Sequence, residues 1–456
     1  MANRVLDSPK IGRLLFKLSA PAMVGMFVMA TYNVADTIFI GRGVGSLAIA
    51  AVILIAPFQI LTFAIATMLG VGGASIYSRL LGAKKDKLAE IAFTNVVRFA
   101  TFFGLFTTLF GVFFLDSILK WLGTSDLTYI YARDYFGIII WGTLPLIFAV
   151  SLNNIARAEG RAKLAMGTML VSSLINVILD PILIFKFNMG VKGAAYATVF
   201  AEIFTSIYLL VFFLRQKRFL VFTKIFSFAK MRAIAYTAKQ ILTVGMSSFV
   251  NQVSASIMVL VLNNRLMLYG NELSITVFAV YHRTAMFIFM PIYGIVQGMQ
   301  PIAGYNYGAK KFDRVKHVIK LATIAGSSIS LLGFVLLFFF PSLVIGIFTS
   351  DPRVLSLGTR GLKIMSIVFP LIPAQMVGST TFQALGKPMP AIVLNMLRQF
   401  IVIIPLLLIL PMFLDILGVW ISFPISDFVA FCITILLLKR QIEKLSPQNQ
   451  SLQKVI

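Results

Sequence analysis

Twelve long apolar stretches constrain the fold of this chain more than any other feature of its sequence. A run of about 20 apolar residues crosses the hydrocarbon core of a bilayer as an α-helix. The strands of a membrane barrel would be about 10 residues long and would alternate polar with apolar positions, which these stretches do not do. Only 12% of the residues are charged, against about 25% in soluble domains, so we predict an all-α integral membrane protein. The expected spans cover about 18–40, 47–76, 90–116, 129–156, 163–186, 191–214, 238–268, 274–303, 317–348, 355–384, 389–413 and 415–439.

The basic residues are distributed unevenly among the connections between these spans. Most of the 40 Lys and Arg residues lie in the N-terminal tail, in the connections after even-numbered spans and in the C-terminal tail. Because positively charged connections stay in the cytoplasm, we expect a multi-pass protein of the cytoplasmic membrane with both termini inside. A nucleic-acid-binding protein would gather its charge on one folded face, so the net charge of +24 does not predict nucleic-acid binding.

Two loop motifs recur with one spacing in the two halves of the chain. The sequence "GAKK" stands at 82–85 and again at 308–311, and Gly160 and Gly386 are also 226 positions apart. Six spans separate the copies, so both halves enter the membrane from the same side. Such parallel repeats, with a binding cavity between them, are typical of transporters. The predicted domains are an N-terminal six-helix lobe (1–214), a cytoplasmic basic linker (215–237) and a C-terminal six-helix lobe (238–456).

Two carboxylates inside the expected spans are the first candidates for a functional site, because a charge within the membrane is costly. Asp36 follows Tyr32 by four positions and Asp180 follows Asn176 by four, so each acid has a hydrogen-bonding companion on its own helix face. Carboxylate and amide oxygens suit a hard cation. If the two acids meet, their repulsion at about 4 Å and a dielectric near 20 is about 4 kcal/mol, so one of them would hold a proton. The alternatives are a helix-end position near the headgroups for Asp180 and a structural hydrogen bond for Asp36.

Other ionisable residues in the spans favour structural roles. We expect Glu202, Asp427 and Arg398 to form structural pairs or to lie near the membrane interface. Arg283 follows His282, and this pair is open to two readings: a counter-ion for one of the acids, or a fixed positive charge in the second half.

Nothing in the sequence predicts an enzyme or a resident cofactor. Cys432 is the only cysteine, and the two histidines, His282 and His317, are too far apart in sequence to suggest a metal site. No nucleophile–base pair or phosphate-binding loop stands out. The basic start of the chain, followed by a long apolar segment, does not predict a cleavable signal peptide.

Four sequence segments resemble the multidrug and toxic compound extrusion (MATE) family, in the branch whose coupling site lies in the N-terminal half. They are "YSRLLGAKK" (77–85), "ARAEGRAK" (156–163), "NVILDPILIFKFNMGVKGAAYAT" (176–198) and "YNYGAKK" (305–311). The resemblance covers essentially the whole chain. It implies twelve helices in two six-helix bundles, V-shaped around a central cavity. It also implies secondary active export of amphipathic or cationic organic compounds in exchange for H⁺ or Na⁺ by alternating access.

Matching the family's N-terminal site residue by residue implies a set of coupling residues in this chain. They are Tyr32, Asp36, Tyr135, Asn153, Asn176, Asp180 and Thr198. If the coupling ion is Na⁺, four of them are its expected ligands: Asp36, Asn176, Asp180 and Thr198. Pro21 removes one helical hydrogen bond and matches the proline at which the first helix of this branch is proposed to bend.

The second half departs from the branch that binds its cation there. Span seven has no acid among Ser248, Asn251 and Gln252, so we predict no carboxylate site in that lobe. Asn251, Gln252 and Arg283 are instead candidates for a second-lobe cavity. The expected partners are drug-like or metabolite substrates and membrane lipids, with no nucleic acid and a monomeric state.

Two other functions are weighed against efflux. A lipid-linked oligosaccharide flippase of the same superfamily would tend to have more than twelve spans or a strongly basic cavity, for which Arg283 and Arg398 offer little support. A membrane scaffold or receptor would need neither the 226-residue duplication nor paired intramembrane acids.

Overall fold

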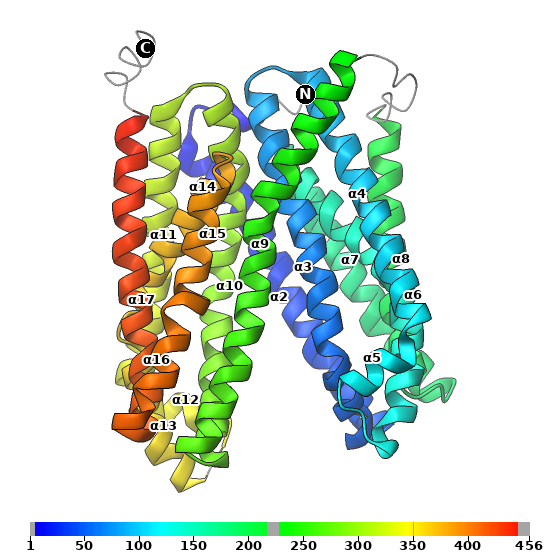
Figure 1. Ribbon diagram of the computed structural model, residues 1–456, viewed down its shortest axis with the longest axis vertical. Helices are drawn as coiled ribbons and strands as arrows, with labels where there is room; N and C mark the ends of the chain where they lie inside the picture. The colour runs from blue at the N-terminus through cyan, green and yellow to red at the C-terminus, as the bar shows by residue number, and fades with distance from the viewer. Residues whose placement is uncertain (1–4, 217–227, 350, 446–456) are drawn as a thin grey trace. The chain divides into compact units, whose positions relative to one another are not determined.

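The computed structural model of the chain describes residues 5–216, 228–349 and 351–445 (Figure 1). Within these residues twelve helices are long and apolar enough to cross a membrane, which confirms the predicted all-α membrane fold. In the first half they are α2 (Ile11–Gly43), α3 (Ser46–Gly82), α4 (Asp86–Phe113), α6 (Asp126–Ala158), α7 (Ala162–Pro181) with η1 (Ile182–Lys186), and α8 (Val191–Arg215). In the second half they are α9 (Phe228–Tyr269), α10 (Glu272–Gly308), α11 (Phe312–Phe339), α13 (Pro352–Ser366) with η3 (Phe369–Leu371) and α14 (Ile372–Ala384), α15 (Pro388–Met396) with η4 (Leu397–Ile401) and α16 (Ile403–Ile409), and α17 (Pro411–Lys444).

Two spans end earlier than the apolar sequence predicts. The stretches expected at 90–116 and 317–348 end as helices at Phe113 and Phe339, and a separate short helix follows each: α5 (Leu115–Trp121) and α12 (Pro341–Gly346). The residue before a proline is disfavoured in the α conformation, which accounts for the break at Phe340. Hydropathy alone does not detect such a break, because the short helices are themselves apolar.

The internal repeat predicted from two loops extends to the helix boundaries and to the backbone of those loops. Helices α4 and α11 both have 28 residues and begin 226 positions apart. Lys84 and Lys310, also 226 apart, share a positive φ of 56° and 58°. The equivalent glycines have φ values of 79° at Gly160 and 72° at Gly386. Glycine adopts this left-handed conformation at little cost, so the two glycines allow the same tight turn in each half.

The chain forms two compact units that exchange the beginnings of two helices. Unit 1 comprises the residues up to Leu6 and Val24–Phe249, and unit 2 comprises Asp7–Met23 and Val250–Ile456. The first part of α9 therefore belongs to unit 1, and the first part of α2 belongs to unit 2. Residues 217–227 of the expected linker lie outside the described residues, and α9 already begins at Phe228. The predicted domain boundaries at 214 and 238 stay a prediction.

Side-chain hydrogen bonds hold these two exchanged helix starts. In unit 1, Asn95 of α4 donates to the Ile234 carbonyl at 2.9 Å and to the Thr237 hydroxyl at 2.8 Å. In unit 2, Arg314 of α11 donates to the Ser8 carbonyl at 2.6 Å. Each contact joins a helix start to a helix of the unit to which that start belongs.

The core of unit 1 is built around α6. This helix contacts α3, α4, α7 and α8, so its side chains are in reach of most of the unit. Tyr135 and Phe136 of α6 are buried together with Ile55 of α3 and Ala195 of α8. The position of α6 explains why the polar residues of this helix meet those of its neighbours.

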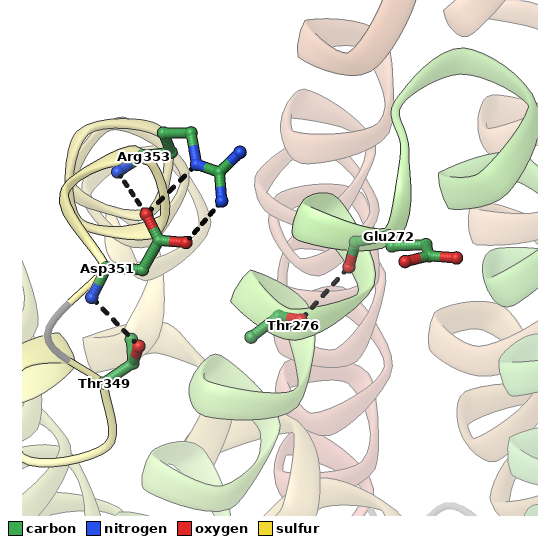
Figure 2. Close-up of polar contacts among 5 residues, drawn as sticks. All are labelled: Glu272, Thr276, Thr349, Asp351 and Arg353. Atoms are coloured by element: carbon green, nitrogen blue, oxygen red, sulfur yellow. Dashed lines mark hydrogen bonds and ion pairs between the residues drawn. The ribbon is translucent and has the colours of Figure 1, made fainter.

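The core of unit 2 lies between α10, α13 and α17. Trp420 and Phe369 are its largest fully buried side chains, and Phe369 belongs to the short turn η3 that joins α13 to α14. Helix α13 starts with a cap: the Asp351 carboxylate accepts from the Arg353 amide at 2.9 Å. Figure 2 shows this carboxylate bonded to Arg353 and the Asp351 amide nitrogen bonded to Thr349, with the Glu272 side chain at the start of α10 pointing away from them. Inside α17, Asp415 leaves helical geometry (φ 47°, ψ −138°), at the residue where the sequence predicts the last span to begin.

Candidate functional site

Asp36 and Asp180 come together inside unit 1. Asp36 lies on α2 and Asp180 is the penultimate residue of α7, and their carboxyl groups are close enough to share a hydrogen bond when one of them is protonated. Asp180 is completely buried and Asp36 is half-buried. Both oxygens of Asp180 and the Oδ1 of Asp36 are buried without a hydrogen-bond donor. The two carboxyl groups therefore have more buried acceptor oxygens than there are donors to satisfy them.

Asn176 and Thr198 extend this group of oxygens from α7 to α8. The Asn176 amide donates to the Thr198 hydroxyl at 3.2 Å between Nδ2 and Oγ1. Asn176 is 2% exposed, and its Oδ1 has no donor. Because Asp180 stands one turn after Asn176, the unpaired amide oxygen and the unpaired carboxylate lie on one face of α7.

The end of α7 has an unusual backbone beside Asp180. Pro181 has no amide hydrogen, so the carbonyl four residues earlier loses its helical partner. The chain then continues as the π-helix η1, which ends at Lys186. Single-turn π-helices within α-helices occur frequently at functional sites. The predicted span over 163–186 is present as Ala162–Lys186, and its backbone changes from an α-helix to a π-helix after Pro181.

Two tyrosines lie within electrostatic range of the acids. The charges of Asp36 and Asp180 both act on Tyr32, and the charge of Asp36 also acts on Tyr135. Tyr135 is buried and interacts with Gln59 of α3. The sequence analysis did not single out Gln59, although a glutamine two residues after Pro57 in an otherwise apolar stretch is a usable signal.

Asn153 of α6 has its observed contacts near the start of α7, away from Asp180 at the end of that helix. Its amide donates to the Ala165 carbonyl at 3.0 Å and to the Thr168 hydroxyl at 2.9 Å, and it accepts a hydrogen bond from Arg157. Thr168 and Asn176 are eight residues apart on one helix, which is about 12 Å. The structure thus brings together six of the seven residues implied by the resemblance and places Asn153 in a neighbouring network.

A second buried network belongs to the "ARAEGRAK" segment. Glu159 is 1% exposed; it accepts from the Tyr77 hydroxyl at 2.6 Å and from Arg161 Nε at 3.0 Å. Arg161 also donates to Gln216 at 3.1 Å. These contacts tie the end of α3 to the α6–α7 turn and to the end of α8. The sequence marks the segment as a motif but does not indicate its partners.

Pro21 lies within a continuous helix. Helix α2 runs from Ile11 to Gly43 through this proline, and the missing amide hydrogen removes one helical hydrogen bond there. Pro21 falls in the part of α2 that belongs to unit 2, whereas Asp36 falls in the part that belongs to unit 1.

The candidates for a second-lobe cavity are not joined by observed contacts. Arg283 is exposed on α10, whereas Asn251 and Gln252 are half-buried on α9. In the described part of unit 2, neither a hydrogen bond nor an ion pair connects any two of these three side chains. Their grouping stays a prediction.

The remaining membrane acids fall into two kinds. Asp427 is 3% exposed and pairs with Arg398 at 2.7 Å, and its backbone carbonyl accepts from Gln375 at 2.6 Å. Glu202 of α8, for which the sequence also favours a structural role or a place near the interface, has neither an ion pair nor a hydrogen bond within the described residues.

The groups left unsatisfied around Asp36 and Asp180 are hydrogen-bond acceptors. Within the described residues, no cluster of three or more His, Cys, Asp or Glu side chains has the arrangement of a metal site. The unpaired oxygens are instead two carboxylates and one amide, which a proton or a hard monovalent cation would satisfy.

Comparisons with known proteins identify a family that this chain matches. The family model described as MatE matches residues 21–182 and 243–409. Multidrug export protein MepA of Staphylococcus saprophyticus subsp. saprophyticus is 28% identical over 396 residues, covering 87% of this chain and 86% of the relative.

Two solved structures have a similar fold. One is described as the outward-facing conformation of a multidrug resistance MATE family transporter of the MOP superfamily; it has a TM-score of 0.89 at 27% identity and covers 98% of both chains. The other is a crystal structure of MATE in the bent conformation, with a TM-score of 0.90 at 27% identity, which covers 98% of this chain and 99% of that one.

Proposed function

Because this chain belongs to the MatE family of membrane transporters, we propose that it is a multidrug exporter driven by an exchanged cation, H⁺ or Na⁺. The organic compounds that it carries out of the cell are amphipathic or cationic. The names of its relatives support the cargo, since they are multidrug export proteins. Both termini lie in the cytoplasm, in agreement with the distribution of basic residues.

The observation that carries this proposal is the meeting of Asp36 and Asp180 without a basic partner. Three of their four oxygens are buried without a donor, so two negative charges there would lack a counter-ion and most of their hydration. Their mutual repulsion is about 4 kcal/mol at a separation near 4 Å and an effective dielectric near 20. The pair is therefore stable only when it binds a cation, and it gives up that cation only when its surroundings change.

A proton and Na⁺ would use the same residues differently. A proton would bridge the two carboxyl groups. Na⁺ would bind between Asp36 and Asp180 and would also take the Asn176 amide oxygen, which has no donor, with Thr198 beside it. Either cation lowers the net charge of the acid pair from −2 to −1, which relieves the repulsion between α2 and α7. Alternating exposure of this site to the two sides of the membrane then couples cation entry to export.

Transport by purified protein in proteoliposomes tests the proposal. Ethidium movement is measured first under an imposed pH gradient and then under an imposed Na⁺ gradient. We expect one of these gradients to drive ethidium export by the wild type and to drive none in Asp36→Asn, which remains inserted in the membrane. Wild-type rates in Asp36→Asn would refute the role of the acid pair.

A further inference from the structure

Glu202 is a membrane carboxylate that the cation site does not use. It lies on α8, four positions after Thr198, and therefore on the same face of that helix one turn further on. Its side chain is half-buried, and within the described residues no cation or hydrogen-bond donor satisfies it. A charge inside a membrane span is expensive, so an acid kept there without a structural partner calls for a ligand.

Helix α6 leaves space for this carboxylate. A Cβ atom placed on Gly142 would come within 2.6 Å of Glu202 Oε2, which is closer than real contacts allow. Glycine at this position therefore lets the acid lie directly against the α6 backbone. Gly142 is two turns after Tyr135 on one face of α6, so the carboxylate is in line with the tyrosine of the cation site.

The electrostatic neighbours of Glu202 link it to the cluster in unit 1. Its charge acts on Tyr32 and on Tyr135, and the charge of Asp36 acts on the same two tyrosines. The charged groups that act on these two tyrosines are all acidic. Tyr32 and Tyr135 are thus electrostatic neighbours both of Asp36 and of Glu202.

An independent observation is that several buried oxygens of this cluster have no hydrogen-bond donor among the described residues. The fully buried Asp180 and the 2% exposed Asn176 both direct oxygens into the cluster without receiving a hydrogen bond. One small cation would satisfy these inner oxygens. It would not satisfy Glu202, which is half-buried and stands a helical turn away.

We propose that Glu202, with Tyr32 and Tyr135, is the point at which the transported organic cation is recognised, while Asp36 and Asp180 hold the exchanged ion. This inference rests on the proposed export function and adds a residue that sets the preference for charged cargo. A quaternary ammonium or phosphonium ion has no proton to donate, so it is held by a nearby negative charge and by aromatic rings. A proton or Na⁺ needs a tight group of oxygens, which only the inner pair provides. Glu202 then binds the organic cation, and Asp36 and Asp180 bind the exchanged ion.

Binding to the full-length protein without any gradient tests the assignment. The probe is tetraphenylphosphonium, and its dissociation constant is measured by calorimetry for the wild type and for Glu202→Gln. We expect binding to weaken about tenfold or more in Glu202→Gln, and Glu202→Asp, which keeps the charge, to recover most of the affinity. Ser206→Ala, one turn further along α8, is the matched control and should bind as the wild type does.

A second variant moves the acid without removing it. Gly142→Ala forces Oε2 away from α6, so its affinity for tetraphenylphosphonium should fall between those of the wild type and Glu202→Gln. The inference is overturned if the wild type shows no saturable binding, if Glu202→Gln binds within twofold of the wild type, or if Glu202→Asp is as weak as Glu202→Gln.

The same measurement on Asp36→Asn separates this inference from the proposed function. We expect Asp36→Asn to bind tetraphenylphosphonium within about threefold of the wild type while it loses gradient-driven export. Normal export by Asp36→Asn would refute the coupling proposal alone. Equal losses of binding in Asp36→Asn and Glu202→Gln would refute the division of roles.

Discussion

Asn176 donates a hydrogen bond to Thr198 across the contact between α7 and α8, with 3.2 Å between Nδ2 and Oγ1. This bond fixes the orientation of the amide: because the nitrogen faces α8, the oxygen faces away from it. That oxygen has no donor, and neither have the two oxygens of Asp180 one turn further on. A single side-chain contact between two helices thus sets the direction in which a buried acceptor points.

Removal of the Thr198 hydroxyl should weaken binding of the exchanged ion. Thr198→Val keeps the shape of the side chain but leaves the Asn176 amide nitrogen without its acceptor. An unsatisfied buried polar group costs about 1–3 kcal/mol, so we expect the ion concentration for half-maximal export to rise about fivefold or more. Thr198→Ser should remain within about twofold of the wild type. Equal values for the valine and serine variants would show that the hydroxyl plays no part.

The Arg398–Asp427 pair should stabilise unit 2 only as a complete pair. Asp427→Ala leaves a largely buried guanidinium without its partner, which costs about 3 kcal/mol or more and should lower the melting temperature in detergent. At the positions 226 residues earlier, unit 1 has Ser172, whose hydroxyl donates to the Ala201 carbonyl at 3.5 Å. The double variant Arg398→Ser, Asp427→Ala copies that arrangement and should melt above Asp427→Ala alone. A double variant less stable than the single one would contradict this.

Asp351 should make α13 more stable above pH 4 than below it. The side-chain hydrogen bond from Arg353, together with the bond from the Arg353 amide, holds the pKa of this carboxyl below its usual value. Its contribution is therefore fully present above the unfolded-state pKa of about 3.9 and is lost as the pH falls through the lower folded-state pKa.

The measurement for Asp351 is the melting temperature as a function of pH. Asp351→Ala should melt below the wild type at pH 7, and the difference should narrow as the pH falls below about 4. Asp351→Asn keeps a capping side chain but loses the charge, so it should lie between them at pH 7. A constant difference in melting temperature between the wild type and Asp351→Ala at every pH would exclude the charge as the cause.

Lys87, at the start of α4, and Lys120, in α5, should lie on opposite sides of the membrane. Lys87 and Lys120 are both exposed, and Cys432 is the only native cysteine. In a Cys432→Ser background, a membrane-impermeant maleimide added to intact cells should label Lys120→Cys and should not label Lys87→Cys until the cells are opened. The reverse pattern would place the termini outside.

The sequence by itself determined the membrane fold. Helices of about 20 apolar residues are dictated by bilayer thickness, so the twelve spans are readable from hydropathy alone, and one offset of 226 positions reveals the duplication. The spacing of four residues in Tyr32–Asp36 and in Asn176–Asp180 is likewise visible in the sequence, and it predicts that each pair lies on one helix face.

Only the tertiary structure decided which of these helix faces meet. Asp36 and Asp180 are 144 positions apart, and no local rule brings them together. No local rule places the Glu202 carboxylate against Gly142 either. Nor does one explain why Asp427 pairs with Arg398 while Glu202 has no ion pair within the described residues. Inside a bilayer, lipid tails solvate every apolar helix face about equally well. Hydropathy therefore does not determine which helices pack against each other. Packing between side chains makes that choice, and it depends on the whole unit at once.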